Sequence, residues 1–213
     1  MMNSVPTKSF RTALLAGLLA LGSAVAQAQP APSEADILKA LSPAQQPLTR
    51  GLSIGARGGE SRGGGEDRAF LDTLRNRTSF SPAERERIAA ASADKQSIDL
   101  EIPFDYASST IGPKALPLVK SLGGALSQLK GNTFLVVGHT DGKGTDQTNQ
   151  ALSERRAEAV RQYIIQNYGV APANIVAVGY GKSHLKDTGN PLAATNRRVT
   201  AVNMSAVKSA SRF

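Results

Sequence analysis

The chain has 213 residues, of which 40% are hydrophobic, and a formal charge of +8 from 25 basic and 17 acidic residues. This length predicts one or two domains, and the hydrophobic content is sufficient for a core. Cysteine is absent, which excludes a disulfide framework, thiol chemistry and a lipid attached to a thiol. The basic charge favours anionic surroundings but identifies no partner.

The start of the chain is predicted to be a secretory signal peptide. Lys8 and Arg11 precede an uncharged run from Ala13 to Ala26, and Ala26-Gln27-Ala28 offers a small-residue cleavage site. The apolar run is shorter than the ~20 residues of a membrane-spanning helix, although an uncleaved anchor is the alternative. No later stretch of the sequence reads as a transmembrane helix. We expect a mature chain from Gln29 in the periplasm of a Gram-negative bacterium, with association with the outer membrane as an option.

Two short helices are expected before the main domain. The segment from Ser33 to Leu41 is typical of two helical turns that begin at a serine N-cap, and we interpret it as a docking peptide. A second helix is expected after Ser81, because Pro82 suits the first helical position and Glu84 completes a capping box.

Residues 49–68 are rich in glycine and arginine and contain almost nothing that could be buried. Ordering this segment would cost entropy without compensation, so we expect a flexible linker. Its two Arg-Gly-Gly triplets, at 57–59 and 62–64, resemble segments that bind RNA. A nucleic-acid-binding or envelope scaffold protein is therefore the alternative to a linker, and our preferred interpretation includes no nucleic acid.

The hydrophobic pattern predicts a compact domain over residues 97–204. Its expected elements are a strand at 97–104, a helix at 116–129, a strand at 133–139, a helix at 149–168 capped by Gly169, and strands at 174–181 and 197–204. The strand at 133–139 is apolar on both faces, which indicates a central or doubly covered position. This β-α-β-α-β-β order predicts an α+β fold with two main helices packed on one side of a small mixed four-stranded sheet.

The predicted organisation is thus a signal peptide (1–28), a mostly flexible N-terminal region with short helices (29–96), the main domain (97–204) and a C-terminal tail (205–213).

One acid and one arginine stand out in residues 138–160, GHTDGKGTDQTNQALSERRAEAV. Asp141 lies in a glycine-rich loop, where Gly142 and Gly144 are expected to allow positive φ angles. Asn149 and Arg156 recur at helical spacing near the start of the following helix and share one face. Asp141 is therefore expected to oppose Arg156 across a shallow site.

A plain salt bridge between Asp141 and Arg156 is one interpretation of this pair, because ion pairs between nearby surface groups are common and weak. The other is a ligand site. Asp141 could accept hydrogen bonds from an ammonium group, while the guanidinium of Arg156 matches a carboxylate bidentately. A zwitterionic carbon, with an amine and a carboxylate, has this shape.

The run at 138–160, together with the later YGKS and NRRV segments in the same order, resembles the OmpA-like C-terminal domain of outer-membrane porins, peptidoglycan-associated lipoproteins and flagellar stator proteins. The resemblance covers about residues 97–204. It implies noncovalent binding of peptidoglycan through the diaminopimelate of its stem peptides, in which Asp141 holds the amine and Arg156 the carboxylate.

The same resemblance implies roles for further residues. Asn149 and Leu152 would shape the pocket, Phe104 and Asp105 would supply a backbone contact with the ligand, and Thr140 would belong to the site or shape its turn. The family's NRR signature matches Asn196, Arg197 and Arg198, which are expected to support the site structurally. Another envelope protein could bind the N-terminal region.

Catalysis is the competing interpretation of the domain. The GYGKS segment is similar to a phosphate-binding loop, but position 176 is valine where the consensus requires glycine. His139 and His184 could ligate a metal with Asp141, although two dispersed histidines without cysteine are a weak signal. No nucleophile elbow is present. We therefore expect a protein that is not an enzyme and has no cofactor or metal.

Overall fold

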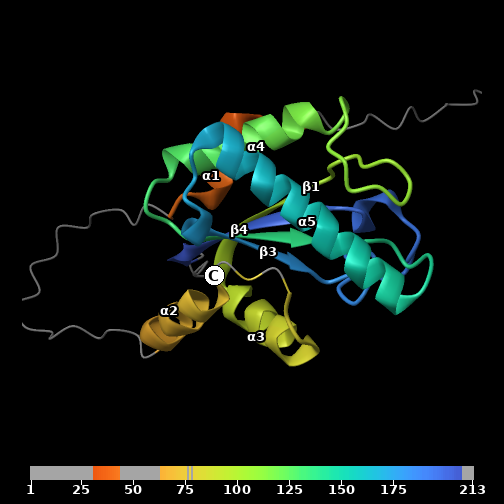
Figure 1. Cartoon of the computed structure of the whole chain (residues 1–213), viewed down its shortest axis with the longest axis horizontal. Coiled ribbons are helices and arrows are strands. Elements are labelled where there is room, and N and C mark those ends of the chain that lie inside the picture. Colours follow the sequence, from red (N-terminus) through yellow and green to blue (C-terminus); the bar gives the residue numbers. More distant parts are fainter. Residues whose placement is uncertain (1–30, 44–62, 76, 78, 208–213) are drawn as a thin grey trace, which may run out of the picture. The chain divides into compact units, whose positions relative to one another are not determined.

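The computed structural model describes residues 31–43, 63–75, 77 and 79–207, and Figure 1 shows their arrangement. The predicted signal peptide lies outside the described residues. So do most of the glycine- and arginine-rich segment and the last six residues. Among the helices of the described ranges, none combines the length and apolar content needed to cross a bilayer.

A mixed four-stranded sheet forms the centre of the fold, which confirms the predicted α+β class. Its strands are β1 (Lys95–Leu100), β2 (Phe134–Gly138), β3 (Ile175–Gly179) and β4 (Val199–Val207), in the spatial order β1-β4-β2-β3. Strand β2 pairs in parallel with β3, whereas β4 is antiparallel to both β1 and β2. Strand β2 is buried throughout and central, as its apolar pattern predicted.

One face of the sheet is covered by three helices (Figure 1): α1 (Glu34–Leu41), α4 (Leu116–Gln128) and α5 (Asp146–Tyr168). Phe134 and Val136 of β2 point into this core, together with Leu122 of α4 and Val160 of α5. Short 3₁₀ turns at Pro172–Asn174 and Ala194–Asn196 complete the domain.

The opposite face is covered by α2 (Gly63–Leu74) and α3 (Pro82–Ser92). Phe70, Leu74 and Ile88 form a second core with the alternate residues of β2, Leu135 and Val137. The two main helices of the predicted domain, α4 and α5, pack on one side of the sheet as predicted, and the second cover comes from outside that domain. Because β2 is apolar on both faces, the sheet needs a second cover, and the N-terminal region supplies it.

The N-terminal region is more structured than the sequence indicated. Ser33 caps α1 as predicted, but Ile37 and Leu41 are fully buried, and the side-chain amide of Asn203 donates a 2.9 Å hydrogen bond to the Leu41 carbonyl. The expected disorder is wrong for residues 63–68, which belong to α2. The buried apolar side chains in the second half of α2 offset the entropy of ordering this glycine-rich turn.

The ends of β1, α5 and β4 differ from the predicted ones. Strand β1 runs from Lys95 to Leu100 instead of 97–104, because its pairing with β4 stops where Leu100 meets Val199. Helix α5 starts at Asp146, three residues early, because the Thr145 hydroxyl accepts a 3.2 Å hydrogen bond from the amide of Thr148. Strand β4 continues to residue 207 and so includes the start of the predicted tail. The capping box of α3 and the left-handed C-cap at Gly169 are as predicted.

Candidate functional site

The site lies where α5 begins, over the ends of β2 and β3. A Cβ atom at Gly138 would collide with the backbone oxygen of Ser153, and one at Gly179 with the backbone nitrogen of Glu154. The hydroxyl of Ser153 also accepts a 2.8 Å hydrogen bond from the amide of Gly181. The missing side chains let the helix backbone approach the sheet, and this fixes the direction in which Arg156, one turn later, points.

The loop between β2 and α5 is held by hydrogen bonds along its length. The Thr140 amide donates to the Gly181 carbonyl and the Gly142 amide to the Pro191 carbonyl, both at 2.8 Å. Only Gly144 of the two loop glycines has a positive φ, +92°. The expectation for Gly142 is wrong: its lack of a side chain instead makes room for Pro191.

Asn149 fastens the same loop to the helix. Its side chain is buried, and its amide group donates to the carbonyls of Lys143 at 2.8 Å and Thr145 at 3.0 Å. The amide hydrogens of Asn149 therefore position the loop that carries Asp141. Leu152, one turn before Arg156, is half-buried.

Arg156 is the buried cation of the site, with 7% of its surface exposed. Its Nε donates to the Ser108 carbonyl at 2.9 Å and its Nη2 to the Asp105 carbonyl at 3.2 Å, while the guanidinium lies 4.9 Å from the ring centre of Phe104. No acidic side chain within the described parts of the chain lies at ion-pair distance from it. Burial lowers the pKa of Arg156, and the charge of Asp141 opposes this shift. The guanidinium is thus fixed by neutral acceptors and keeps an unneutralised charge.

The guanidinium of Arg156 faces a cavity of about 210 Å³. The other residues that line it are Glu101, Ile102, Pro103, Phe104, Ala194 and Arg197. Its walls therefore come from the segment after β1, from α5 and from the segment before β4.

Asp141 forms an ion pair with Arg197, and not with Arg156 as the salt-bridge interpretation would require. One carboxylate oxygen accepts from Arg197 Nη1 at 3.0 Å and the other from the Lys143 amide at 3.2 Å. A direct Asp141–Arg156 salt bridge is not formed. Two carboxylate oxygens offer about four acceptor positions, so these bonds leave the partly exposed Asp141 able to accept further donors. Sequence reasoning missed that Arg197 both binds Asp141 and lines the Arg156 cavity.

The other two residues of the NRR signature brace the surrounding chain. Asn196 is fully buried: its side-chain oxygen accepts from the amides of Lys186 at 2.8 Å and Asp187 at 2.9 Å, and its amide group donates to three carbonyls. Arg198 donates to the Asp99 carboxylate and the His184 carbonyl, both at 3.3 Å. Neither residue lines the cavity beside Arg156.

Two buried polar groups close to Asp141 in the sequence lack hydrogen-bond partners among the described residues. The Thr140 hydroxyl and His139 Nδ1 have no hydrogen-bond partner in the described structure. Burial is the main cause that lowers the pKa of His139 to about 3, and the positive charge of Arg198 lowers it further. His139 is therefore neutral at physiological pH. Within the described residues, no three acidic or histidine side chains are grouped so that they could hold a metal.

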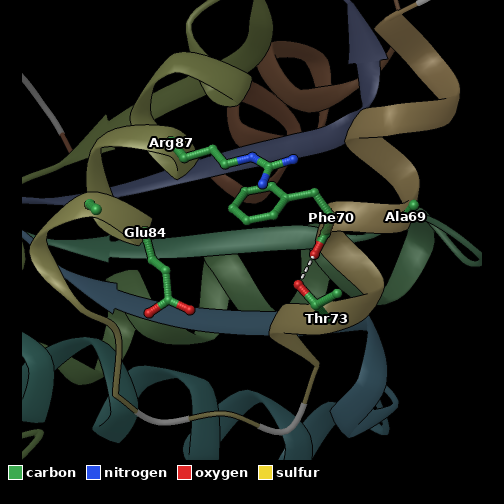
Figure 2. A pocket seen from close by; sticks show the side chains of 6 residues that line it. Ala69, Phe70, Thr73, Glu84 and Arg87 are labelled. Carbon is green, nitrogen blue, oxygen red and sulfur yellow. Dashed lines mark hydrogen bonds between the residues drawn. The ribbon is translucent and has the colours of Figure 1, made fainter.

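A larger surface cavity of about 600 Å³ lies between α2 and α3 (Figure 2). The guanidinium of Arg87 lies 4.0 Å from the ring centre of Phe70, and Glu84 at its edge forms a 2.6 Å ion pair with Arg77. None of the site residues expected from the sequence lines this cavity.

Comparison with known proteins places these residues in a family. Outer membrane porin F of Pseudomonas fluorescens is 41% identical over 106 residues, which cover 49% of this chain and 32% of that protein. The peptidoglycan-associated lipoprotein of Pseudomonas aeruginosa is 43% identical over 100 residues, 45% of this chain and 57% of that protein. The chain therefore spans about a third of the first relative and a little over half of the second.

Among solved structures, the peptidoglycan-associated lipoprotein from Burkholderia pseudomallei is 30% identical and covers 53% of this chain and 92% of its own, with a TM-score of 0.41. Residues 103–198 match the OmpA family. This range contains both cavity-lining arginines, the loop of Asp141 and the bracing Asn196. The chain therefore carries an OmpA family domain at residues 103–198.

Proposed function

We propose that the protein binds peptidoglycan noncovalently through the diaminopimelate of its stem peptides, and that it contributes to anchoring in the cell envelope. The relatives described as peptidoglycan-associated lipoproteins support binding of this polymer. The observation that carries the proposal is the buried Arg156, whose charge has no acidic partner among the described residues and which faces a cavity.

The zwitterionic end of the ligand would supply an anion to Arg156 and a cation to Asp141. A carboxylate on the remaining edge of Arg156 would neutralise a guanidinium whose other edge is held by the carbonyls of Asp105 and Ser108. The ammonium group on the same ligand carbon would be accepted by Asp141, whose charge already acts on Arg156. Phe104 would contribute through its contact with the guanidinium and as part of the cavity wall.

Each domain is expected to bind its ligand weakly. Charge-assisted hydrogen bonds contribute about 1.5–3 kcal/mol each, and desolvation and lost freedom of motion oppose them. Strong attachment to the wall would come from many stem peptides bound at once. The proposed location is the periplasm, near the outer membrane, in agreement with the relatives named as outer membrane proteins. Another envelope protein could bind the N-terminal region.

Calorimetry of the mature protein with the tripeptides Ala-γ-Glu-diaminopimelate and Ala-γ-Glu-lysine tests the ligand. The side chain of the lysine peptide ends in an amine without a carboxylate, so its binding would leave Arg156 unmatched, and we expect it to bind at least ~10-fold more weakly. Equal affinities for the two compounds would refute the assignment of the carboxylate to Arg156.

Arg156→Lys tests the residue, and Arg161→Lys is its matched control. Both arginines lie on α5, are buried and donate to backbone carbonyls, but Arg161 has an acidic neighbour, Glu158, at 3.1 Å. We expect both variants to lose some stability, but only Arg156→Lys should stop sedimenting with purified sacculi. The proposed site would be overturned if Arg156→Lys still sediments with sacculi. It would also be overturned if both variants are folded and neither sediments with sacculi.

A further inference from the structure

Two large hydrophobic side chains are markedly exposed in the described structure, and both adjoin the site. Tyr106 is 88% exposed and follows directly after Asp105, whose carbonyl holds Arg156. Leu192 is 61% exposed, and its carbonyl accepts a 3.4 Å hydrogen bond from Arg197, the partner of Asp141. Exposed apolar side chains are common on protein surfaces, so the informative feature is that both residues adjoin backbone groups that hold the arginines of the site.

Lys143 adds an unneutralised cation beside Tyr106. Its Nζ lies 5.7 Å from the centre of the Tyr106 ring, and none of the described acidic side chains forms an ion pair with it. Two neighbouring lysines differ in this respect, since Lys182 pairs with Asp146 at 3.1 Å and Lys186 with Asp99 at 2.8 Å.

The backbone of Lys143 fixes the place from which this side chain extends. Its amide donates to Asp141 and its carbonyl accepts from Asn149, at 3.2 and 2.8 Å. The Lys143 side chain therefore starts two residues from the acid proposed to bind the ligand's amine, on a loop segment held at both backbone groups.

We infer that Tyr106 and Lys143 form a second contact region, which binds the glutamate that precedes diaminopimelate in the stem peptide. This inference rests on the proposed function and extends it from one residue of the ligand to two. In a stem peptide this glutamate is joined through its side-chain carboxyl, so its main-chain carboxylate is free unless it is amidated. In the proposed arrangement, the ligand fixed by its zwitterionic end continues past Lys143 and Tyr106, where the ammonium meets the carboxylate and the ring meets the aliphatic chain.

The chemical signature of this region is a preference for free over amidated glutamate. Lys143 is exposed, so its pairing with the carboxylate is screened by water, and we expect a two- to fivefold difference in affinity, about what an exposed ion pair gives. Tyr106 would strengthen the binding of both peptide forms relative to free diaminopimelate.

The test is calorimetry of the mature protein with three ligands: diaminopimelate, the tripeptide Ala-γ-Glu-diaminopimelate, and the same tripeptide with the glutamate amidated. For the wild type we expect the acid tripeptide to bind about two- to fivefold more tightly than the amide. Lys143→Gln should bring this ratio to one. Lys120→Gln, which removes an equal charge from an exposed position of α4, should leave the ratio unchanged.

The ratio is the decisive readout, because any general disturbance of the loop affects both tripeptides alike and cancels. Tyr106→Ala should weaken both tripeptides, and Tyr106→Phe should restore them. Binding of diaminopimelate without discrimination between the tripeptides would overturn this inference alone. The same holds if Lys143→Gln retains the wild-type ratio. Failure of all three ligands to bind would overturn the proposed function together with this inference.

Discussion

Helix α1 was expected from the sequence to be a docking peptide, and replacing Leu41 with alanine tests whether it belongs to the core instead. Leu41 is fully buried, and α1 packs against α4, β1 and β4. The structure provides a matched control in Leu192, which is 61% exposed. The two substitutions remove the same atoms, so any difference between them reports burial.

The expected loss of stability follows from this difference in burial. A leucine-to-alanine change in a closed core costs about 2–5 kcal/mol, which is a large part of the ~5–15 kcal/mol that stabilises a typical domain. The hydrogen bond from Asn203 to the Leu41 carbonyl involves the backbone, so the substitution leaves it in place. Leu192→Ala should change the free energy of unfolding by no more than about 0.5 kcal/mol.

Urea unfolding of a chain that begins at Gln29, followed by circular dichroism, measures both variants. With a dependence of about 2 kcal/mol per molar urea, the middle of the typical range, the midpoint of Leu41→Ala should fall by roughly 1–2.5 M, while that of Leu192→Ala stays near the wild type. If the two variants unfold at the same urea concentration, α1 is not packed in solution, and the interpretation of this segment as an appendage is restored.

Three other predictions concern the frame of the site. Gly138→Ala should lower the free energy of unfolding by at least ~2 kcal/mol, because the methyl group would collide with the Ser153 backbone. Gly112→Ala, with open space around it, should be near neutral. Equal unfolding midpoints of the two variants would contradict the close approach of α5. His139 has its pKa lowered from 6.5 to about 3, so the folded protein binds fewer protons than the unfolded chain in this interval. Its contribution to stability is complete above pH 6.5 and is lost as the pH falls toward 3, and an unchanged slope of stability against pH in His139→Gln would refute this account. Asn196→Ala leaves buried backbone groups unpaired and should lower the free energy of unfolding by about 1–3 kcal/mol; a wild-type melting temperature would rule out its bracing role.

Features that depend on residues close together in the chain were predictable. The capping box of α3 joins Ser81 to Glu84, and the C-cap of α5 needs only the left-handed conformation of Gly169. The apolar pattern of β2 similarly indicated a central strand without any knowledge of its neighbours. These signals are local because helix caps and side-chain alternation are set within a few residues.

Features that depend on distant residues were decided only by the folded structure. The sequence alone led to the prediction of a site with Asp141 and Arg156, but not to the finding that Arg197, 56 residues from Asp141, binds the acid while Arg156 is held by carbonyls. The cover of the second sheet face by Phe70 and its neighbours was equally hidden, because the glycine- and arginine-rich composition just before Phe70 predicts a flexible linker. Burial and ion pairing depend on which side chains meet in space, and that is determined when the sheet and its helices pack together.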